Sequence, residues 1–273
     1  MEAKLKKFLY KILHEIIRRI VKFRYLVMYR KDTPEDTLKF YNKMRYIYKS
    51  EFLKRENFCK SLKNSKISDS LNKNGYSITN LCDISKKKEF FETITKFRKK
   101  FDEINQPEKN IDSITKKYLI DYSFEFNYDV KIIADPFVEI VSKYLGTLPI
   151  LDSFQIWYSP NNSEELVGSK LLHRDAEDFK QLKIFIPIED IQLENGPLNV
   201  IDKDQSEKLY RNLIKQNLIR RRNQKIDDKH INGSDYSTQK ILLNKDQCAL
   251  VDTCACYHFG SRKSLKPRKL LFL

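Results

Sequence analysis

The stretch Leu172-His173-Arg174-Asp175-Ala176-Glu177-Asp178-Phe179 contains the most informative pattern of the chain. Its His173 and Asp175 are two residues apart, so on an extended segment both side chains point to the same side. A second His from elsewhere in the fold would complete three ligands on one face of a metal ion and leave the other face open. Two His and one carboxylate in this arrangement are typical of non-haem Fe(II) sites. The stretch therefore predicts a metal site.

Few residues can supply the second His ligand, because the chain contains four His in all. His14 lies in an amphipathic segment and His230 in a charged one, where helix-surface and solvated positions are expected. His258 borders a β-rich run near the C-terminus, and Arg268 follows it ten residues later. The paired acid, the second His and the downstream Arg together favour a metal site that His258 shares with the first stretch.

A zinc site is the alternative interpretation of the same region. Cys254, Cys256 and His258 alternate along the chain, so on a strand all three side chains would face one way. Cys and His are the usual zinc ligands, but a fourth ligand at standard spacing and a Cys-x-x-Cys pair are both missing. We therefore expect the two Cys to line the interior of the fold as small apolar residues.

The chain is strongly basic, with 52 Lys and Arg against 37 Asp and Glu and a net charge of +15. Residues 1–31 contain ten Lys and Arg against two Glu, and residues 203–230 contain nine against four acids. Such segments attract nucleic acid, anionic membranes or anionic substrates. The alternative explanation is a biased base composition of the genome, which would also make Lys, Asn and Ile abundant. Residues 203–230 lack the interleaved aromatic residues that bind single-stranded nucleic acid, so nucleic acid is disfavoured as a partner.

Cysteine usage and the N-terminus favour a cytoplasmic protein. The five Cys are an odd number without framework spacing, which is typical of reduced thiols. No run reaches the ~18 apolar residues that span a bilayer, and no secretion signal is recognisable. Residues 3–30 predict an amphipathic helix. Its apolar face packs on the protein or a partner, or residues 1–31 lie on anionic lipid as a peripheral membrane contact.

The first half of the chain is predicted to be mainly helical. Thr33-Pro34 resembles a helix start and predicts a helix to about residue 59, followed by a polar linker over 60–70. Asn74-Gly75 predicts a turn into a strand. Two further helices are expected around 86–104 and 134–145.

From Leu148 onward the pattern becomes β-rich. Short runs of strand type separated by turn residues favour an all-β sandwich or barrel core. The charged segment 203–230 interrupts this core and is predicted to be a solvated helix. The expected strands are 151–158, 182–188, 197–201, 239–243, 248–252 and 268–273.

From about Leu71 to the C-terminus the chain resembles the phytanoyl-CoA dioxygenase family of Fe(II)- and 2-oxoglutarate-dependent oxygenases. The resemblance is carried, in order, by segments 71–76, 144–146, 172–179, 182–186, 194–197 and 252–262 and by Arg268. It implies a mainly β fold with α-helices, a double-stranded β-helix (jelly-roll) core with flanking helices. Residues 1–69 would form a basic helical N-terminal extension, and residues 70–273 the oxygenase domain with a basic helical insert at about 203–238.

The resemblance also implies roles for single residues. His173, Asp175 and His258 would bind the iron, and Arg268 would hold the far carboxylate of 2-oxoglutarate through its planar guanidinium. Arg262 competes for this last role, because alternation along the final strand leaves both Arg open. Further co-substrate contacts are predicted for Gln155, Lys183 and Ser261.

One departure from the family concerns the segment after Ile201. A Pro-Gly-Ser-His-like turn is usual there, whereas Asp202-Lys203-Asp204-Gln205 leads into the insert. Substrate contacts near this turn therefore do not transfer from the resemblance.

The resemblance implies an oxygenase that hydroxylates a small molecule. With Fe(II) and O2, such an enzyme oxidatively decarboxylates 2-oxoglutarate to succinate. A carboxylate at Asp175 favours hydroxylation, since Ala or Gly there would open a halide site. The alternative is a catalytically inactive jelly-roll scaffold whose basic segments bind membrane or nucleic acid. The sequence indicates neither the substrate nor the oligomeric state.

Overall fold

The structure, a computed structural model, describes residues 34–103, 118–121, 127–159, 166, 168–175, 180–220, 224–231, 236–260, 262 and 264–273. Contacts between residues divide the chain into two compact units, 1–47 and 48–273. Helix α2 (Pro34–Ile47) is the described element of the first unit. The helix expected over 3–30 lies outside the described residues. Among those residues, no helix combines the length and the apolar character that crossing a membrane requires.

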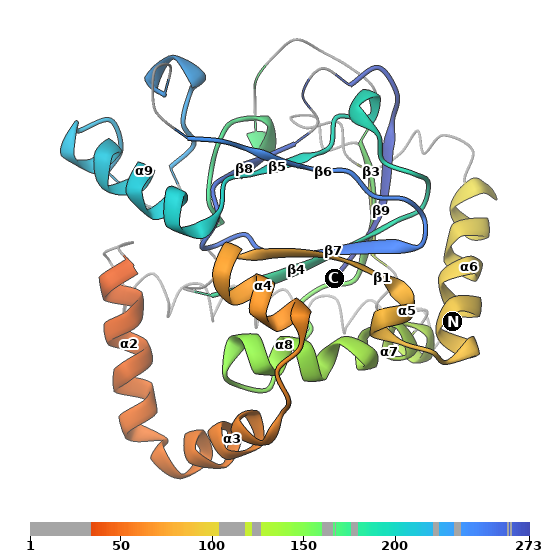
Figure 1. Ribbon diagram of the computed structural model, residues 1–273, viewed down its shortest axis with the longest axis horizontal. Coiled ribbons are helices and arrows are strands. Elements are labelled where there is room, and N and C mark those ends of the chain that lie inside the picture. The colour runs from red at the N-terminus through yellow and green to blue at the C-terminus, as the bar shows by residue number, and fades with distance from the viewer. Residues whose placement is uncertain are drawn as a thin grey trace, which may run out of the picture. The chain divides into compact units, whose positions relative to one another are not determined.

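Two antiparallel sheets form the centre of the second unit (Figure 1). The larger sheet has the strand order β1-β7-β4-β9-β3-β2, and the smaller one has the order β6-β5-β8. The strands of the larger sheet are β1 (Tyr76–Asn80), β2 (Tyr118–Asp121), β3 (Gln155–Ser159), β4 (Leu182–Pro187), β7 (Gln247–Asp252) and β9 (Arg268–Phe272). Those of the smaller sheet are β5 (Leu198–Val200), β6 (Gln239–Ile241) and β8 (His258–Phe259).

Apolar side chains fill much of the space between the two sheets. Side chains alternate between the faces of each strand, so on β4 Phe185 points between the sheets while Ile184 and Ile186 point to the helices. The buried residues between the sheets are Phe185, Ile191, Val200, Ile241, Leu243, Ala249, Val251, Cys256, Leu270 and Phe272. Two facing antiparallel sheets with this interior form the predicted jelly-roll core.

Helices cover the outer face of the larger sheet, below β7, β4 and β1 in Figure 1. They bury Leu71, Phe90, Ile133 and Tyr144 against the outward side chains of the strands, and each such side chain contributes about 1.5–3 kcal/mol to stability. The helices of this unit are α3 (Lys49–Ser61), α4 (Lys66–Asn74), α5 (Leu81–Ile84), α6 (Lys88–Glu103), α7 (Asn127–Ala134), α8 (Val138–Leu145) and α9 (Lys203–Lys215). Short 3-10 turns are η1 (Asp135–Phe137), η2 (Gly168–Lys170), η3 (Leu193–Asn195) and η4 (Asp228–His230).

The segment expected to be a polar linker over 60–70 differs from the prediction, because α4 begins within it. The Ser65 side chain caps this helix by accepting a hydrogen bond from the Ser68 N–H, and the Ser68 side chain accepts one from the Ser65 N–H. Ile67 and Leu71 then enter the core. The boundary of the extension after residue 69 stays a prediction.

The insert also differs from the prediction of a solvated helix. Helix α9 buries Leu209, Tyr210 and Leu213 along one face, at the three- and four-residue spacing of an amphipathic helix. These side chains belong to a separate cluster, which we call the insert core. It comprises Leu172, Ile201, Leu209, Tyr210, Leu213, Ile219, Ile226, Ile231 and Tyr257. The prediction missed this apolar face because Lys and Arg on the other sides of the helix dominate the sequence pattern.

Replacing Gly75 with Ala is expected to lower the free energy of unfolding by roughly 2–5 kcal/mol. Gly75 ends α4 with a φ of 81°, and a Cβ there would lie 2.4 Å from Cys256 Sγ. Gly146 is the matched control, because it ends α8 with a φ of 75° but has nothing within 4 Å of an added Cβ. Gly146→Ala therefore costs only the left-handed backbone strain, roughly 1–2 kcal/mol. Urea denaturation of both variants measures the difference, and equal losses would contradict the close approach to Cys256.

Candidate metal centre

Backbone pairing brings the two predicted His together. His173 and His258 form an isolated antiparallel bridge in which each N–H donates to the other residue's carbonyl, at 3.1 and 2.9 Å. Asp175 lies on the same extended segment as His173, and its N–H donates to the Thr253 carbonyl at 2.9 Å. The His-x-Asp segment is thus held at both ends by the chain around β8.

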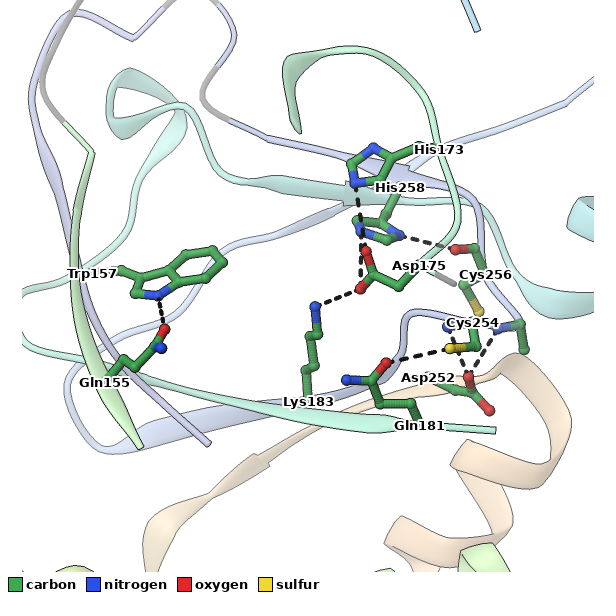
Figure 2. Close-up of polar contacts among 11 residues, drawn as sticks. Gln155, Trp157, His173, Asp175, Gln181, Lys183, Asp252, Cys254, Cys256 and His258 are labelled. Atoms are coloured by element: carbon green, nitrogen blue, oxygen red, sulfur yellow. Dashed lines mark hydrogen bonds and ion pairs between the residues drawn. The ribbon is translucent and has the colours of Figure 1, made fainter. Parts of the chain in front are cut away.

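The three side chains converge on one point (Figure 2). The Asp175 carboxylate oxygens lie 3.7 Å from His173 Nε2 and 3.9 Å from His258 Nε2, and all three ligand atoms lie within 4.8 Å of one another. Two ligands that each lie about 2.1 Å from one ion are roughly 3–4.4 Å apart, so small side-chain rotations complete the set. Among the described residues this is the one group of three or more His, Cys, Asp or Glu with such a geometry.

The hydrogen bonds of the two rings prepare them as ligands. His173 Nδ1 lies 2.8 Å from the Leu171 carbonyl oxygen, and His258 Nδ1 lies 3.0 Å from the Cys256 carbonyl oxygen. A carbonyl oxygen only accepts hydrogen bonds, so Nδ1 carries the proton in both rings and Nε2 carries the lone pair. Both Nε2 atoms face Asp175, which is the tautomer and orientation that a metal site requires. The residues present therefore fit a divalent metal ion.

The protonation states fit as well. Burial, reinforced by the neighbouring His173, lowers the pKa of His258 to about 4. Burial alone would raise the pKa of Asp175, but His258 and the Lys183 ammonium outweigh it and lower this pKa to about 2. At neutral pH the group thus presents a neutral imidazole at His258 and a carboxylate, which are the metal-binding forms of both.

The three polar residues predicted on core strands all face the space between the sheets. Lys183 forms an ion pair with Asp175 at 2.5 Å (Figure 2). Its ammonium also lies over the Phe272 ring. Gln155 is paired with Phe272 across β3 and β9 and accepts a hydrogen bond from Trp157 at 2.7 Å. Arg268 is paired with Ser159, so it occupies the same face of the sheet as Gln155.

The two candidate Arg have different surroundings. Arg262 donates to both oxygens of Asp228 at 2.8 and 3.0 Å, and its guanidinium lies over the Phe259 ring. Arg268 is 6% exposed and donates to the Gly196 carbonyl at 2.6 Å. A Cβ added to Gly260, two residues after His258, would lie 3.1 Å from Arg268 Nη1. Burial lowers the pKa of Arg268 to about 10. Arg268 is therefore the Arg that lies in the interior next to the metal-ligand strand.

Three remaining sequence expectations concern the neighbourhood of His258. Ser261 lies outside the described residues. The zinc alternative assumed a strand, but 253–255 form a turn, and neither Cys joins a metal-ligand group among the described residues. Cys256 is buried between the sheets, as predicted for a small apolar residue, and Cys254 Sγ contacts Gln181.

Sequence reasoning overlooked Arg174, between the two ligands of the first stretch. This Arg is 1% exposed. A charged residue flanked by two interior-facing residues of an extended segment is normally read as solvent-facing. Helix α9 of the insert and the Tyr257 ring cover that side and bury it.

In sequence, the chain matches no protein-family model and none of the curated proteins. In structure, it is similar to the epimerase SnoN in complex with Fe3+, alpha ketoglutarate and nogalamycin RO. That likeness has a TM-score of 0.51 and 10% identity, over 76% of this chain and 80% of that one. HygX from Streptomyces hygroscopicus, with nickel and 2-oxoglutarate bound, has a TM-score of 0.51 and 11% identity over 77% of this chain and 85% of its own.

EctD from S. alaskensis in its apoform has a TM-score of 0.50 and 12% identity, over 77% of this chain and 76% of its own. This chain has their jelly-roll fold. The predicted fold class is confirmed, and at these identities the likeness concerns the fold alone.

The low pKa of His258 makes the stability of the metal-free protein depend on pH. In the unfolded chain a His has a pKa of about 6.5, so between about pH 6.5 and 4 the unfolded state binds a proton that the folded state does not. Stability is therefore fully present above pH 6.5 and falls toward pH 4 by up to about 1.4 kcal/mol per pH unit. His258→Asn should flatten this slope in urea denaturation with EDTA, while the exposed His230→Asn should not. Equal slopes for His258→Asn and wild type would contradict the buried neutral imidazole.

Proposed function

We propose that this protein is an Fe(II)- and 2-oxoglutarate-dependent oxygenase that hydroxylates a small molecule. The observation that carries the proposal is the cluster of His173, Asp175 and His258, in which both rings present Nε2 to the carboxylate. Proteins with this fold include one complexed with Fe3+ and alpha ketoglutarate and one with nickel and 2-oxoglutarate, which supports this choice of metal and co-substrate.

Different residues of the chain would bind the iron and shape the site around it. His173, Asp175 and His258 would hold the iron by one face and leave the opposite face for the co-substrate and O2. When bound, the iron supplies oxidative decarboxylation of 2-oxoglutarate, in which one oxygen atom of O2 enters succinate and the other enters a C–H bond of the substrate. The stacked rings of Trp157 and Phe272, with centroids 4.4 Å apart, would form one apolar wall of the site beside Lys183, which lies over the Phe272 ring.

The co-substrate is a dianion, and the interior of the fold offers cations for it. Arg268 would bind its far carboxylate with two parallel hydrogen bonds, at a buried position where a charge-assisted pair is strong. Lys183 and Gln155 face the same space and would contact the co-substrate or the substrate. Ser261 remains a proposed contact on the basis of the sequence.

Hydroxylation and family membership are the finer parts of the proposal. Asp175 supplies a third protein ligand where Ala or Gly would leave room for a halide, so we propose hydroxylation. Because an epimerase also has this fold, product analysis has to identify the reaction. The order of the sequence motifs supports membership of the phytanoyl-CoA dioxygenase family. The five free Cys support the proposed cytoplasmic location.

Anaerobic addition of Fe(II) and 2-oxoglutarate to the wild-type protein is expected to produce a visible charge-transfer band. His173→Ala removes one ligand and should abolish the band, while the exposed His230→Ala should retain it. The measurement is an absorption titration. A wild-type protein with neither a band nor co-substrate binding would overturn the enzyme and favour the scaffold whose basic segments bind membrane or nucleic acid.

Arg268→Lys is expected to raise the dissociation constant of 2-oxoglutarate by about tenfold or more, because an ammonium cannot make two parallel bonds to a carboxylate. Arg262→Lys should change it by less than about threefold, since Arg262 is engaged with Asp228. Titrating the charge-transfer band with 2-oxoglutarate measures both constants. The reverse order of effects would assign the role to Arg262.

A further inference from the structure

We propose that Arg174 is a positioning residue through which helix α9 of the insert sets the geometry of the metal ligands. This inference rests on the proposed function in one respect, that the cluster of His173, Asp175 and His258 binds a metal ion. It goes beyond that function because it assigns a role to the insert. Neither the insert nor Arg174 touches the reacting atoms.

Arg174 is among the largest fully buried side chains, at 1% exposed. Its guanidinium carbon lies 4.6 Å from the centroid of the Tyr257 ring and 5.6 Å from that of the Tyr210 ring. Its Nη1 lies 3.4 Å from Glu207 Oε2. Burying a cation costs several kcal/mol unless it is paired and stacked, and two ring faces with one carboxylate offset that cost. A side chain held in this way is rigid.

The place of Arg174 in the chain connects this rigid group to all three ligands. Side chains alternate along an extended segment, so Arg174 points away from the side on which His173 and Asp175 meet the metal. Tyr257, which it stacks on, directly precedes His258. One guanidinium therefore links the two segments that carry the three ligands.

The far side of the guanidinium belongs to the insert. Tyr210 and Glu207 are three residues apart on α9, so they share one face of that helix. Ser206 on the same helix accepts a hydrogen bond from the Tyr257 N–H at 2.8 Å. Helix α9 thus holds both the cation and the residue before His258.

A second part of the insert holds the residue before His173. The Ile226 N–H donates to the Leu172 carbonyl at 2.8 Å, in an antiparallel bridge between these two residues. Leu172 and Tyr257 both lie in the insert core, together with Leu209 and Tyr210. Leu172 and Tyr257 immediately precede the two His ligands. Both are 0% exposed and pack against the insert.

Such support has a measurable consequence. Ligands bind a metal well only when they are held within about 0.5 Å of the productive geometry. Removing a group that orients ligands costs about 10- to 100-fold in metal affinity. Loss of Arg174 would let the His-x-Asp segment and the segment before His258 shift relative to each other.

The experiment titrates purified full-length variants with Co(II) under anaerobic conditions and records the visible d–d absorption, which reports the coordination geometry. Arg174→Met is expected to weaken Co(II) binding by about 10- to 100-fold and to alter the spectrum. Arg174→Lys keeps the charge without the planar face and should recover only part of the affinity. Tyr210→Leu, which leaves Arg174 and Tyr257 in place, should weaken binding by a smaller factor.

The matched control is Arg211→Met. Arg211 is also on α9 and also pairs with Glu207, at 3.1 Å, but its side chain is 77% exposed. Its loss should leave the Co(II) affinity within about twofold of wild type. Urea denaturation of every variant establishes that it is folded, and Tyr210→Leu serves as the test if Arg174→Met does not fold.

The proposal would be overturned if Arg174→Met showed the Co(II) affinity and spectrum of the wild type. If Arg174→Met does not fold, the same result for Tyr210→Leu would overturn it. Failure of the proposed function is distinguishable from this. A wild-type protein that binds Co(II) but shows no Fe(II)–2-oxoglutarate band loses the oxygenase assignment, while the Co(II) titrations still decide the role of Arg174. A wild-type protein that binds no Co(II) overturns both.

Discussion

The candidate site depends on the two-residue bridge between His173 and His258. Each residue exchanges both backbone hydrogen bonds with the other, so their rings stand side by side with centroids 4.4 Å apart. A slip of one residue in this register would send one ring to the opposite face. Asp175 follows His173 by one full period of the strand, so the same register also brings the carboxylate to the rings.

The bridge is held from two sides. On the inner side lie the buried apolar residues between the sheets, with Phe272 stacked on Trp157, and such a low-dielectric surrounding strengthens charge interactions. On the outer side, the insert core includes Leu172 and Tyr257, which directly precede the two His. A short bridge of two hydrogen bonds would be a weak support alone, and the two packed layers compensate for this.

Two cationic side chains and one carboxylate lie in the interior around the bridge. The interior-facing positions of the core strands carry Lys183 and Arg268, and Asp175 is the acid that Lys183 pairs with. A cation in a dry interior favours an anion beside it, and a dicarboxylate co-substrate is an anion of that kind. Asp252, at the end of β7, is also buried but points toward the helical layer. It accepts a hydrogen bond from Tyr144 of α8 at 2.7 Å, which links that layer to the sheet.

Features that depend on neighbouring residues could be predicted from the amino-acid sequence. The spacing of His173 and Asp175, the Asn74-Gly75 turn and the β-rich runs are local, and strand period and turn chemistry predict them from a few positions. The resemblance to a known family added the order of motifs, and with it the jelly-roll fold.

Which distant segments meet becomes visible only in the folded chain. Our proposal that Arg268 and not Arg262 holds the co-substrate rests on Asp228, which belongs to the insert and forms an ion pair with Arg262. The burial of Arg174 and of one face of α9 depended on contacts between segments more than thirty residues apart, such as Arg174 with Glu207. Local patterns carry no information about such pairs, because their energy comes from burial and pairing that exist only once the chain has folded.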